Sequence, residues 1–287
     1  MLLQRIVTAI VLLVVLVLAC VYLTPFSFSL FVGVVVLLAA WEWVAFIGLA
    51  SFASKLGYLA SLAILLLTTS VFLGVQPDTS SLYVDRVVVV SILGLLFWVC
   101  AAFLVIDYPA RKSLWNKESK IAAMGIFALL PTWVGVVQLK YFEPSGVLVL
   151  GLVILVAAVD IGAYFSGKAL GKTKLSVELS PNKTWEGVWG GVGLSLLIML
   201  AFTWILKTYY YDLGVIQFVI LAVTSLVLAF FSVIGDLLES MLKRNQKLKD
   251  SGKILPGHGG ILDRVDGLIA ATPIFVLAIT AVLLGVI

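Results

Sequence analysis

Charged side chains gather in one segment near the C-terminus of this apolar chain, from Ser240 to Asp266. The segment holds six of the nineteen Lys and Arg residues of the chain, together with its only histidine, His258. Basic side chains bind phosphate, and carboxylates bind hard divalent cations, which commonly bring substrate phosphates with them. The composition of this segment therefore predicts a site for a polyphosphate and a metal ion.

The acidic residues around this segment have helical spacing. Four polar residues upstream predict one face of a helix that runs out of a membrane: Asp236, Glu239, Ser240 and Lys243. Downstream, Asp263 and Asp266 stand one turn apart at the start of a second apolar helix. The glycine-rich turn from Pro256 to Gly260 separates the two helices, and glycines let backbone N–H groups approach an anion closely. We expect this turn to bring Asp236 and Asp263 together on one metal ion.

A second polar segment lies around residues 160–187. Asp160 stands among small residues near a membrane boundary, where an unpaired carboxylate is costly, so a metal ion or a base should neutralise it. Ser180 is a good N-cap and Pro181 suits the first position of a helix, which predicts a helix that starts here. The free N–H groups of such a helix start, with Lys183 and Thr184, would hold phosphate.

The elements that must position these residues are membrane helices. Hydrophobic residues make up 62% of the chain and charged residues 12%, against roughly 25% charged in soluble domains. Apolar runs of about twenty residues, the length that crosses a bilayer as a helix, recur along the sequence. The fold class is therefore all-α and polytopic, with about nine transmembrane helices at 5–23, 26–48, 57–75, 84–106, 121–139, 146–166, 188–206, 213–235 and 267–287.

The distribution of basic residues predicts the orientation of these spans. With the N-terminus in the cytoplasm, sixteen of the nineteen Lys and Arg residues face the cytoplasm, as the positive-inside rule requires. The loops at 107–120, 167–187 and 236–266 then lie on the same side. We expect a multi-pass protein of the cytoplasmic (inner) membrane whose site faces the cytoplasm.

The two halves of the chain differ in polar content. We interpret residues 1–120 as mainly a scaffold of transmembrane helices and residues 121–287 as the catalytic region, with cytoplasmic-facing loops at 167–187 and 236–266. Glu42 is the exception in the first half, because an acid within a span needs a partner or a polar cavity. The sequence leaves a functional role, a structural pairing and an interfacial position of Glu42 open.

The same segments resemble a known family. The C-terminal one is similar to the signature of the phosphatidate cytidylyltransferase (CDP-diacylglycerol synthase) family at Ser240, Lys243–Arg244, Lys249–Asp250, Gly252, Leu255–Pro256, His258–Gly260, Asp263–Arg264 and Asp266. The earlier segment resembles that family at Asp160–Tyr164, Gly171–Lys172 and Ser180–Thr184. It departs from the family pattern at Leu170 and Val177, both packing positions. The resemblance covers the second half of the chain in detail and the first half only in hydropathy.

The resemblance implies an enzyme that condenses CTP with phosphatidate to give CDP-diacylglycerol and pyrophosphate, with Mg²⁺ and room for a second cation. It implies catalytic roles for Asp263, Asp266, Lys243, Arg264 and His258. It implies substrate contacts by Lys183, Thr184, Ser180, Asn182, Ser240, Arg244, Lys249, Gly259 and Gly260. Metal ligands would be Asp160, Asp236, Asp263 and Asp266. The expected partners are CTP, phosphatidate and membrane lipids, with no nucleic acid, and a homodimer is left open.

Three other functions fit parts of the sequence. A CTP-dependent polyprenol kinase shares substrates, but the length of the signature favours the cytidylyltransferase. An ion-coupled transporter would use the intramembrane acids, yet it explains the one-sided basic loops poorly. A CDP-alcohol phosphotransferase shares the Asp263-x-x-Asp266-Gly267 pattern, but Ala271 stands where that family has Arg, and no acids follow.

Overall fold

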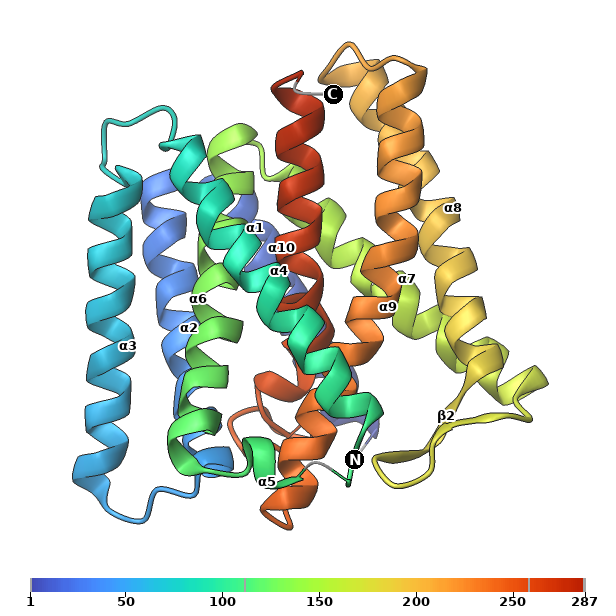
Figure 1. Cartoon of the computed structure of the whole chain (residues 1–287). Coiled ribbons are helices and arrows are strands. Elements are labelled where there is room, and N and C mark those ends of the chain that lie inside the picture. The colour runs from blue at the N-terminus through green and yellow to red at the C-terminus, as the bar shows by residue number, and fades with distance from the viewer. Residues whose placement is uncertain (1, 111, 258, 286–287) are drawn as a thin grey trace.

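A computed structural model describes residues 2–110, 112–257 and 259–285 of the chain (Figure 1). The described part is a bundle of helices with one small two-stranded sheet. In chain order the elements are α1 (Leu2–Tyr22), α2 (Pro25–Ile47), α3 (Phe52–Leu73), α4 (Val84–Ile106), α5 (Lys112–Trp115), α6 (Glu118–Phe142), α7 (Val147–Leu170), β1 (Lys174–Ser176), β2 (Ser180–Thr184), α8 (Trp185–Tyr209), α9 (Val215–Asn245) and α10 (Leu262–Leu283).

The predicted all-α membrane fold is confirmed. Eight helices of the described part, α2 to α4 and α6 to α10, are long and apolar enough to cross a membrane, and Val7–Tyr22 of α1 is a shorter apolar helix. Helix α9 continues ten residues beyond the predicted span 213–235, so the face with Asp236 and Lys243 is helical as predicted. Asp263 lies in the first turn of α10, with Asp266 one turn later.

The polar connections of the bundle gather at one of its ends. The N-terminus, α5, the hairpin of β1 and β2, and the segment between α9 and α10 all lie at the lower end in Figure 1. The C-terminus lies at the opposite end. The three basic loops are therefore on one side of the bundle, as the charge distribution predicted.

Packing in the bundle is closest between α7 and α8. These helices meet along small residues: a Cβ at Gly162 would lie 2.5 Å from the carbonyl oxygen of Gly190, and one at Gly191 would lie 2.7 Å from that of Val159. Such contacts are too short for any side chain larger than hydrogen. The glycines of α8 thus set the distance between α8 and α7, the helix that carries Asp160.

The prediction that a helix begins at Ser180 and Pro181 is wrong. Residues Ser180–Thr184 form strand β2, which pairs antiparallel with β1. Helix α8 begins at Trp185, and its N-cap is Thr184, whose hydroxyl accepts a hydrogen bond from Gly187 N–H at 3.2 Å. Pro181 is tolerated because a two-stranded sheet consists of edge strands, in which an N–H can be missing.

A contact distant in sequence explains why the hairpin prevails over the local helix signal. The carboxylate of Glu186, in the first turn of α8, accepts hydrogen bonds from Lys172 N–H at 3.1 Å and Thr173 N–H at 3.2 Å. In addition, Trp185 N–H donates to the carbonyl of Thr173 at 3.0 Å. These bonds tie the entry of the hairpin to its exit, which fixes residues 174–184 as a closed loop.

Candidate active site

A cavity of about 480 Å³ opens between α7, β2, α8 and α9. Asp160 on α7 and Asp236 on α9 line it with Asn182 and Lys183 of β2. The rest of its wall is largely apolar or small. A cavity of this kind, with a few convergent charged groups on an apolar wall, is typical of a ligand site.

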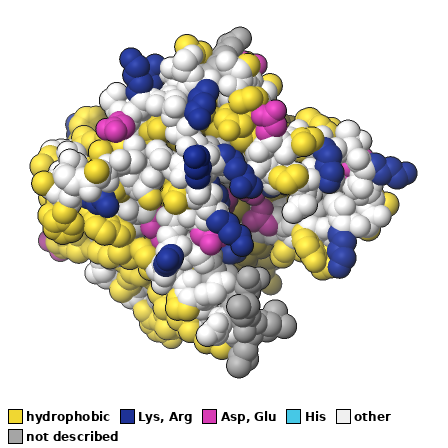
Figure 2. All heavy atoms as spheres, turned by 90° about the horizontal axis from the view of Figure 1, so that it is seen from below, with side chains coloured by type: hydrophobic (Ala, Val, Ile, Leu, Met, Phe, Trp, Pro, Cys, Tyr) yellow, Lys and Arg dark blue, Asp and Glu magenta, His cyan; other side chains and the backbone are white. Residues whose placement is uncertain are grey.

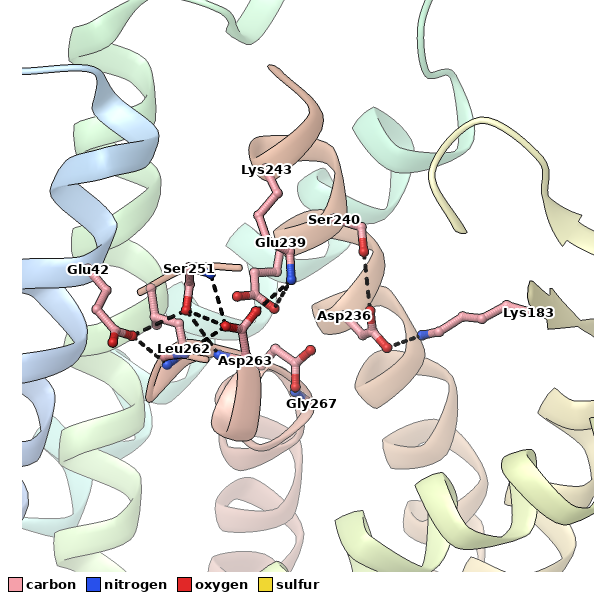
Figure 3. Close-up of polar contacts among 12 residues, drawn as sticks. Glu42, Lys183, Asp236, Glu239, Ser240, Lys243, Ser251, Leu262, Asp263 and Gly267 are labelled. Atoms are coloured by element: carbon pink, nitrogen blue, oxygen red, sulfur yellow. Dashed lines mark hydrogen bonds and ion pairs between the residues drawn. The ribbon is translucent and has the colours of Figure 1, made fainter. Parts of the chain in front are cut away.

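Asp236 and Lys183 form an ion pair at the mouth of this cavity (Figure 3). The second oxygen of Asp236 accepts a hydrogen bond from the Ser240 hydroxyl at 3.3 Å, one turn along α9. The side chain of Lys183 is 26% exposed and that of Asp236 35% exposed. The pair is therefore open to solvent, and a phosphate or a cation that enters the cavity can compete for either partner.

Two more carboxylates lie within electrostatic range of this pair. The charges of Asp236, Lys183 and Asp160 all act on Asp266, whose Oδ1 also accepts Gly267 N–H at 2.8 Å. The charges of Lys183 and Arg264 act on Asp160 in turn. Acids from α7, α9 and α10 thus share one region with two bases.

Asp263 lies in a different environment, where both of its oxygens have partners. Its Oδ1 is 2.7 Å from Lys243 Nζ. Its Oδ2 accepts hydrogen bonds from the backbone N–H groups of Ser251 at 2.9 Å and Gly260 at 2.8 Å, and from the Ser251 hydroxyl at 2.9 Å. This carboxylate therefore fixes the glycine-rich segment against the start of α10.

Lys243 is held between two carboxylates. Besides Asp263, its Nζ lies 3.2 Å from Oε2 of Glu239, four residues earlier on α9. The side chain of Lys243 is 15% exposed, and that of Glu239 5%. Spacing placed Glu239 on the polar face of this helix, but it did not predict that Glu239 would be a buried partner of Lys243.

A further carboxylate reaches this cluster from the N-terminal half. Glu42 of α2 is 3% exposed, and its Oε2 accepts a hydrogen bond from Leu262 N–H at 2.9 Å. The hydroxyl of Ser251 lies 3.3 Å from the same oxygen (Figure 3). The structure thus favours the pairing interpretation of Glu42 and brings in Ser251, which sequence reasoning missed because a serine in a loop carries no distinctive signal.

The end of the bundle that carries these residues is basic. Figure 2 looks onto this end and shows Lys and Arg side chains around a hollow in which Asp and Glu side chains are visible. Arg244 and Lys249 are exposed, as are Arg264 and Lys168. A polyanion approaching this end meets positive charge before it meets the carboxylates.

Known proteins resemble the whole chain. The profile of the cytidylyltransferase family matches residues 3–282. A phosphatidate cytidylyltransferase of Pseudomonas aeruginosa is 41% identical over 275 residues, 96% of either chain. One of Haemophilus influenzae is 37% identical over 283 residues, covering 96% of this chain and 97% of the relative. One of Staphylococcus aureus (strain COL) is 37% identical over 189 residues, 64% of this chain and 69% of the relative.

The chain belongs to the cytidylyltransferase family. The resemblance seen in the polar segments is thereby confirmed, and it extends over the first half, which the motifs alone did not cover.

The remaining residues predicted to contact substrate in this cytidylyltransferase lie in three places. Asn182 and Thr184 both line the cavity: Asn182 is exposed on β2, and Thr184 is the largely buried cap of α8. Ser180 starts β2. Gly259 has a φ of +82°, and a Cβ there would lie 2.7 Å from Asp263 Oδ2, so this position requires glycine. His258 lies outside the described residues.

Metal ligation was predicted for four carboxylates, and the structure pairs two of them with lysines. Asp236 pairs with Lys183 and Asp263 with Lys243, so their joint ligation of one ion stays a prediction. Within the described residues no three His, Cys, Asp or Glu side chains form a preassembled metal site. Mg²⁺ is typically held by one or two carboxylates plus substrate phosphates, and the acids around the cavity suit that mode of binding.

Proposed function

We propose that the residues around this cavity transfer the cytidylyl group of CTP to phosphatidate, giving CDP-diacylglycerol and pyrophosphate. The activity is that of a nucleotidyltransferase, in keeping with relatives of this activity that match 96% of the chain. The observation that supports the location is the open Lys183–Asp236 pair in a cavity that Asp160 also lines. The cavity offers two acids to a cation and Lys183 to a phosphate, and Lys168 also lines it.

The reaction needs little from the protein in the way of acid or base. A phosphate oxygen of phosphatidate is already ionised and forms the new bond to the α-phosphorus of CTP. The bond from that phosphorus to the oxygen that bridges it to the β-phosphorus breaks, and pyrophosphate leaves with both electrons. Rate enhancement in such reactions comes from positioning and from neutralising the phosphate charges.

The basic residues divide between the cavity and its rim. Lys183 and Arg264 are close to the carboxylates, so we assign them to the phosphates that react. Asn182 and the N-terminal turn of α8 add neutral donors beside them. Arg244 and Lys249 are exposed and would guide CTP toward the cavity.

Mg²⁺ would bind to acids in and beside the cavity. We assign Asp160, Asp236 and Asp266 to it, because the first two line the cavity and Asp266 lies within electrostatic range of both. Asp263 would join them only if Lys243 moved from Oδ1 to a phosphate. When bound, the ion would neutralise phosphate charge and orient the triphosphate.

The lipid substrate has a route to the same cavity. Val159, Val188 and Val233 line it beside the charged residues, so the cavity offers apolar as well as polar surface. A phosphatidate headgroup would bind to the polar groups while its glycerol and acyl chains contact the apolar ones. This arrangement supports a reaction at the membrane boundary rather than in bulk water.

The site should face the cytoplasm of a cell whose cytoplasmic membrane holds the protein, because CTP is available there. Cysteines introduced at Asp250 and Val177, one in each polar connection at this end of the bundle, should react with an impermeant reagent from the cytoplasmic side only. Labelling of either position from outside intact cells would contradict this orientation.

A direct assay tests the activity. Detergent-purified protein with labelled CTP, phosphatidate and Mg²⁺ should yield a lipid-soluble cytidine product and one pyrophosphate per turnover. Transfer of a single phosphate from CTP to a polyprenol, with no cytidine in the lipid phase, would instead establish the kinase. Uptake of a solute without lipid product would establish the transporter.

A further inference from the structure

The buried carboxylate of Glu42 lies on α2, far from the catalytic segment in sequence but in contact with it in space. At 3% exposure it has lost most of its hydration, a cost that specific hydrogen bonds must offset. One such bond comes from Leu262 N–H at 2.9 Å. Leu262 is the first residue of α10, where a helix leaves its N–H groups without partners inside the helix, so a carboxylate is well placed there.

The segment before α10 closes tightly over this carboxylate. A Cβ added at Gly252 would lie 2.2 Å from Oε1 of Glu42, and one at Gly260 would lie 2.4 Å from Oε2. Neither position therefore has room for a side chain. Because Gly252 precedes the turn and Gly260 follows it, the backbone approaches Glu42 from both sides of the turn. Between these two glycines, Leu255 and Gly259 pair in an antiparallel bridge.

Ser251 connects Glu42 to Asp263. Its hydroxyl lies 3.3 Å from Glu42 Oε2 and 2.9 Å from Asp263 Oδ2, while its backbone N–H donates to the same Asp263 oxygen at 2.9 Å. Asp263 in turn holds Lys243 at 2.7 Å. A displacement of Ser251 or of Leu262 would therefore move Asp263 and the first turn of α10 (Figure 3), and with it Asp266 one turn later.

Two other contacts from the N-terminal helices hold this connection, one at its start and one at its turn. The side-chain amide of Gln246 donates to the carbonyl of Phe46 at 2.9 Å, at the C-terminal end of α2. The hydroxyl of Thr8, on α1, donates to the carbonyl of Pro256 at 3.0 Å. Glu42 differs from both because its hydrogen bonds reach Ser251, which contacts Asp263, and Leu262, which precedes Asp263 in the sequence.

We propose that Glu42 is a positioning residue for this reaction: its carboxylate fixes Ser251 and the start of α10, and thereby holds Asp263 and the assigned metal ligand Asp266 in place. The proposal rests on the role assigned above to Asp266. It also gives the first half of the chain a part in catalysis beyond that of a scaffold.

Replacement variants of Glu42 test this role. Glu42→Ala removes both hydrogen bonds, so kcat should fall by at least about tenfold, whereas KM for CTP should change by less than about threefold because Lys183, on β2, stays in place. Glu42→Gln keeps an oxygen that accepts from Leu262 N–H, so it should recover most of the lost rate. Ser251→Ala removes the hydroxyl contacts with both Glu42 and Asp263, so it should lower kcat at least as far as Glu42→Ala does. The recovery in Glu42→Gln keeps the test valid if Glu42→Ala inserts poorly.

Glu143→Ala is the matched control, because this glutamate anchors a connection at the opposite end of the bundle. Its carboxylate accepts Ser145 N–H at 3.3 Å and the Tyr211 hydroxyl at 3.3 Å. Burial and the Glu143 charge raise the pKa of Tyr211, so this hydroxyl stays a donor at neutral pH. Glu143→Ala should lower thermal stability as much as Glu42→Ala does and leave kcat unchanged.

Asp263→Asn distinguishes a failure of the positioning role of Glu42 from a failure of the assigned site. If it is inactive while Glu42→Ala and Ser251→Ala keep the wild-type kcat in inserted protein, the positioning role is wrong and the assigned site stands. If Glu42→Ala and Glu143→Ala lower only the yield of folded protein, with equal kcat, Glu42 is structural and the role is again wrong. A near-normal rate in Asp263→Asn would overturn the role of Glu42, which acts through Asp263, and would leave the site assigned to Asp160, Asp236 and Asp266 standing.

Discussion

The two lysine–aspartate pairs of the site differ in what surrounds them. Lys183 and Asp236 are 26% and 35% exposed and line an open cavity. Besides their ion pair, the hydrogen bond described above is that from the Ser240 hydroxyl to Asp236. Lys243 and Asp263 are 15% and 11% exposed. Lys243 also pairs with Glu239, and Asp263 also accepts hydrogen bonds from Ser251 and Gly260. Exposed ion pairs contribute little to stability, whereas breaking a buried one is costly. The open pair is thus suited to exchange partners with substrate, and the buried pair to hold the catalytic segment in place.

The largest expected effect is that of Asp263→Asn. The change keeps size but removes the charge that holds Lys243 and receives three donors, so turnover should fall by at least about a hundredfold. Activity measured against Mg²⁺ concentration checks it, with insertion and folding confirmed by size-exclusion chromatography. An unchanged metal dependence at near-normal rate would show that this carboxylate serves only the fold.

Lys243→Ala should have the next largest effect, and it should appear in stability as well as in activity. Removing the lysine leaves Glu239 and Asp263 close together without their common partner, which lowers the thermal midpoint. Catalytic efficiency should fall by about tenfold to over a hundredfold, the scale of 1.5–3 kcal/mol for a hydrogen bond to a charged group. Steady-state kinetics and thermal unfolding in detergent measure both.

Lys253→Ala is the control for this variant, because Lys253 is an exposed basic residue of the same connection. It should leave both the midpoint and the kinetics near the wild-type values. Equal losses in the two variants would mean that general positive charge at this end of the bundle matters, and not the buried pair.

Lys183→Ala should separate the two pairs most clearly. Because its ion pair is open to solvent, the thermal midpoint should change little, while kcat/KM for CTP falls by roughly tenfold through the loss of one phosphate contact. Kinetics at fixed saturating phosphatidate measure the fall, and Lys172→Ala, exposed at the entry of the same hairpin, serves as the control. A stability loss as large as that of Lys243→Ala would remove the distinction between the pairs.

The smallest effect is expected for Glu186→Gln, which acts on the open pair from a distance. Its carboxylate ties Lys172 and Thr173 to the start of α8, so the substitution should loosen the hairpin that presents Lys183. We expect about a threefold loss in kcat/KM and faster amide exchange confined to residues 172–184. Faster exchange in α9 or α10 as well would show that the hairpin is coupled to the buried pair.

The sequence by itself determined the parts of this protein that depend on local pattern. Apolar runs of membrane-crossing length predicted the helices, because a bilayer requires every spanning backbone group to be bonded within its own helix. The one-turn spacing of Asp263 and Asp266 placed both acids at the start of α10. The motifs at Asp160 and Asp236 identified residues that now line one cavity.

Tertiary structure alone decided which charges meet and where the hairpin lies. Glu42 bonds to a residue 220 positions away, and Asp236 reaches a lysine on another element, pairings that no spacing rule contains. The helix start predicted at Ser180 was wrong, since Glu186 binds the backbone of Lys172 and Thr173 and closes a hairpin around it. A capping signal depends on residues within about one helical turn, whereas the free energy of a buried carboxylate such as Glu42 depends on every element packed around it.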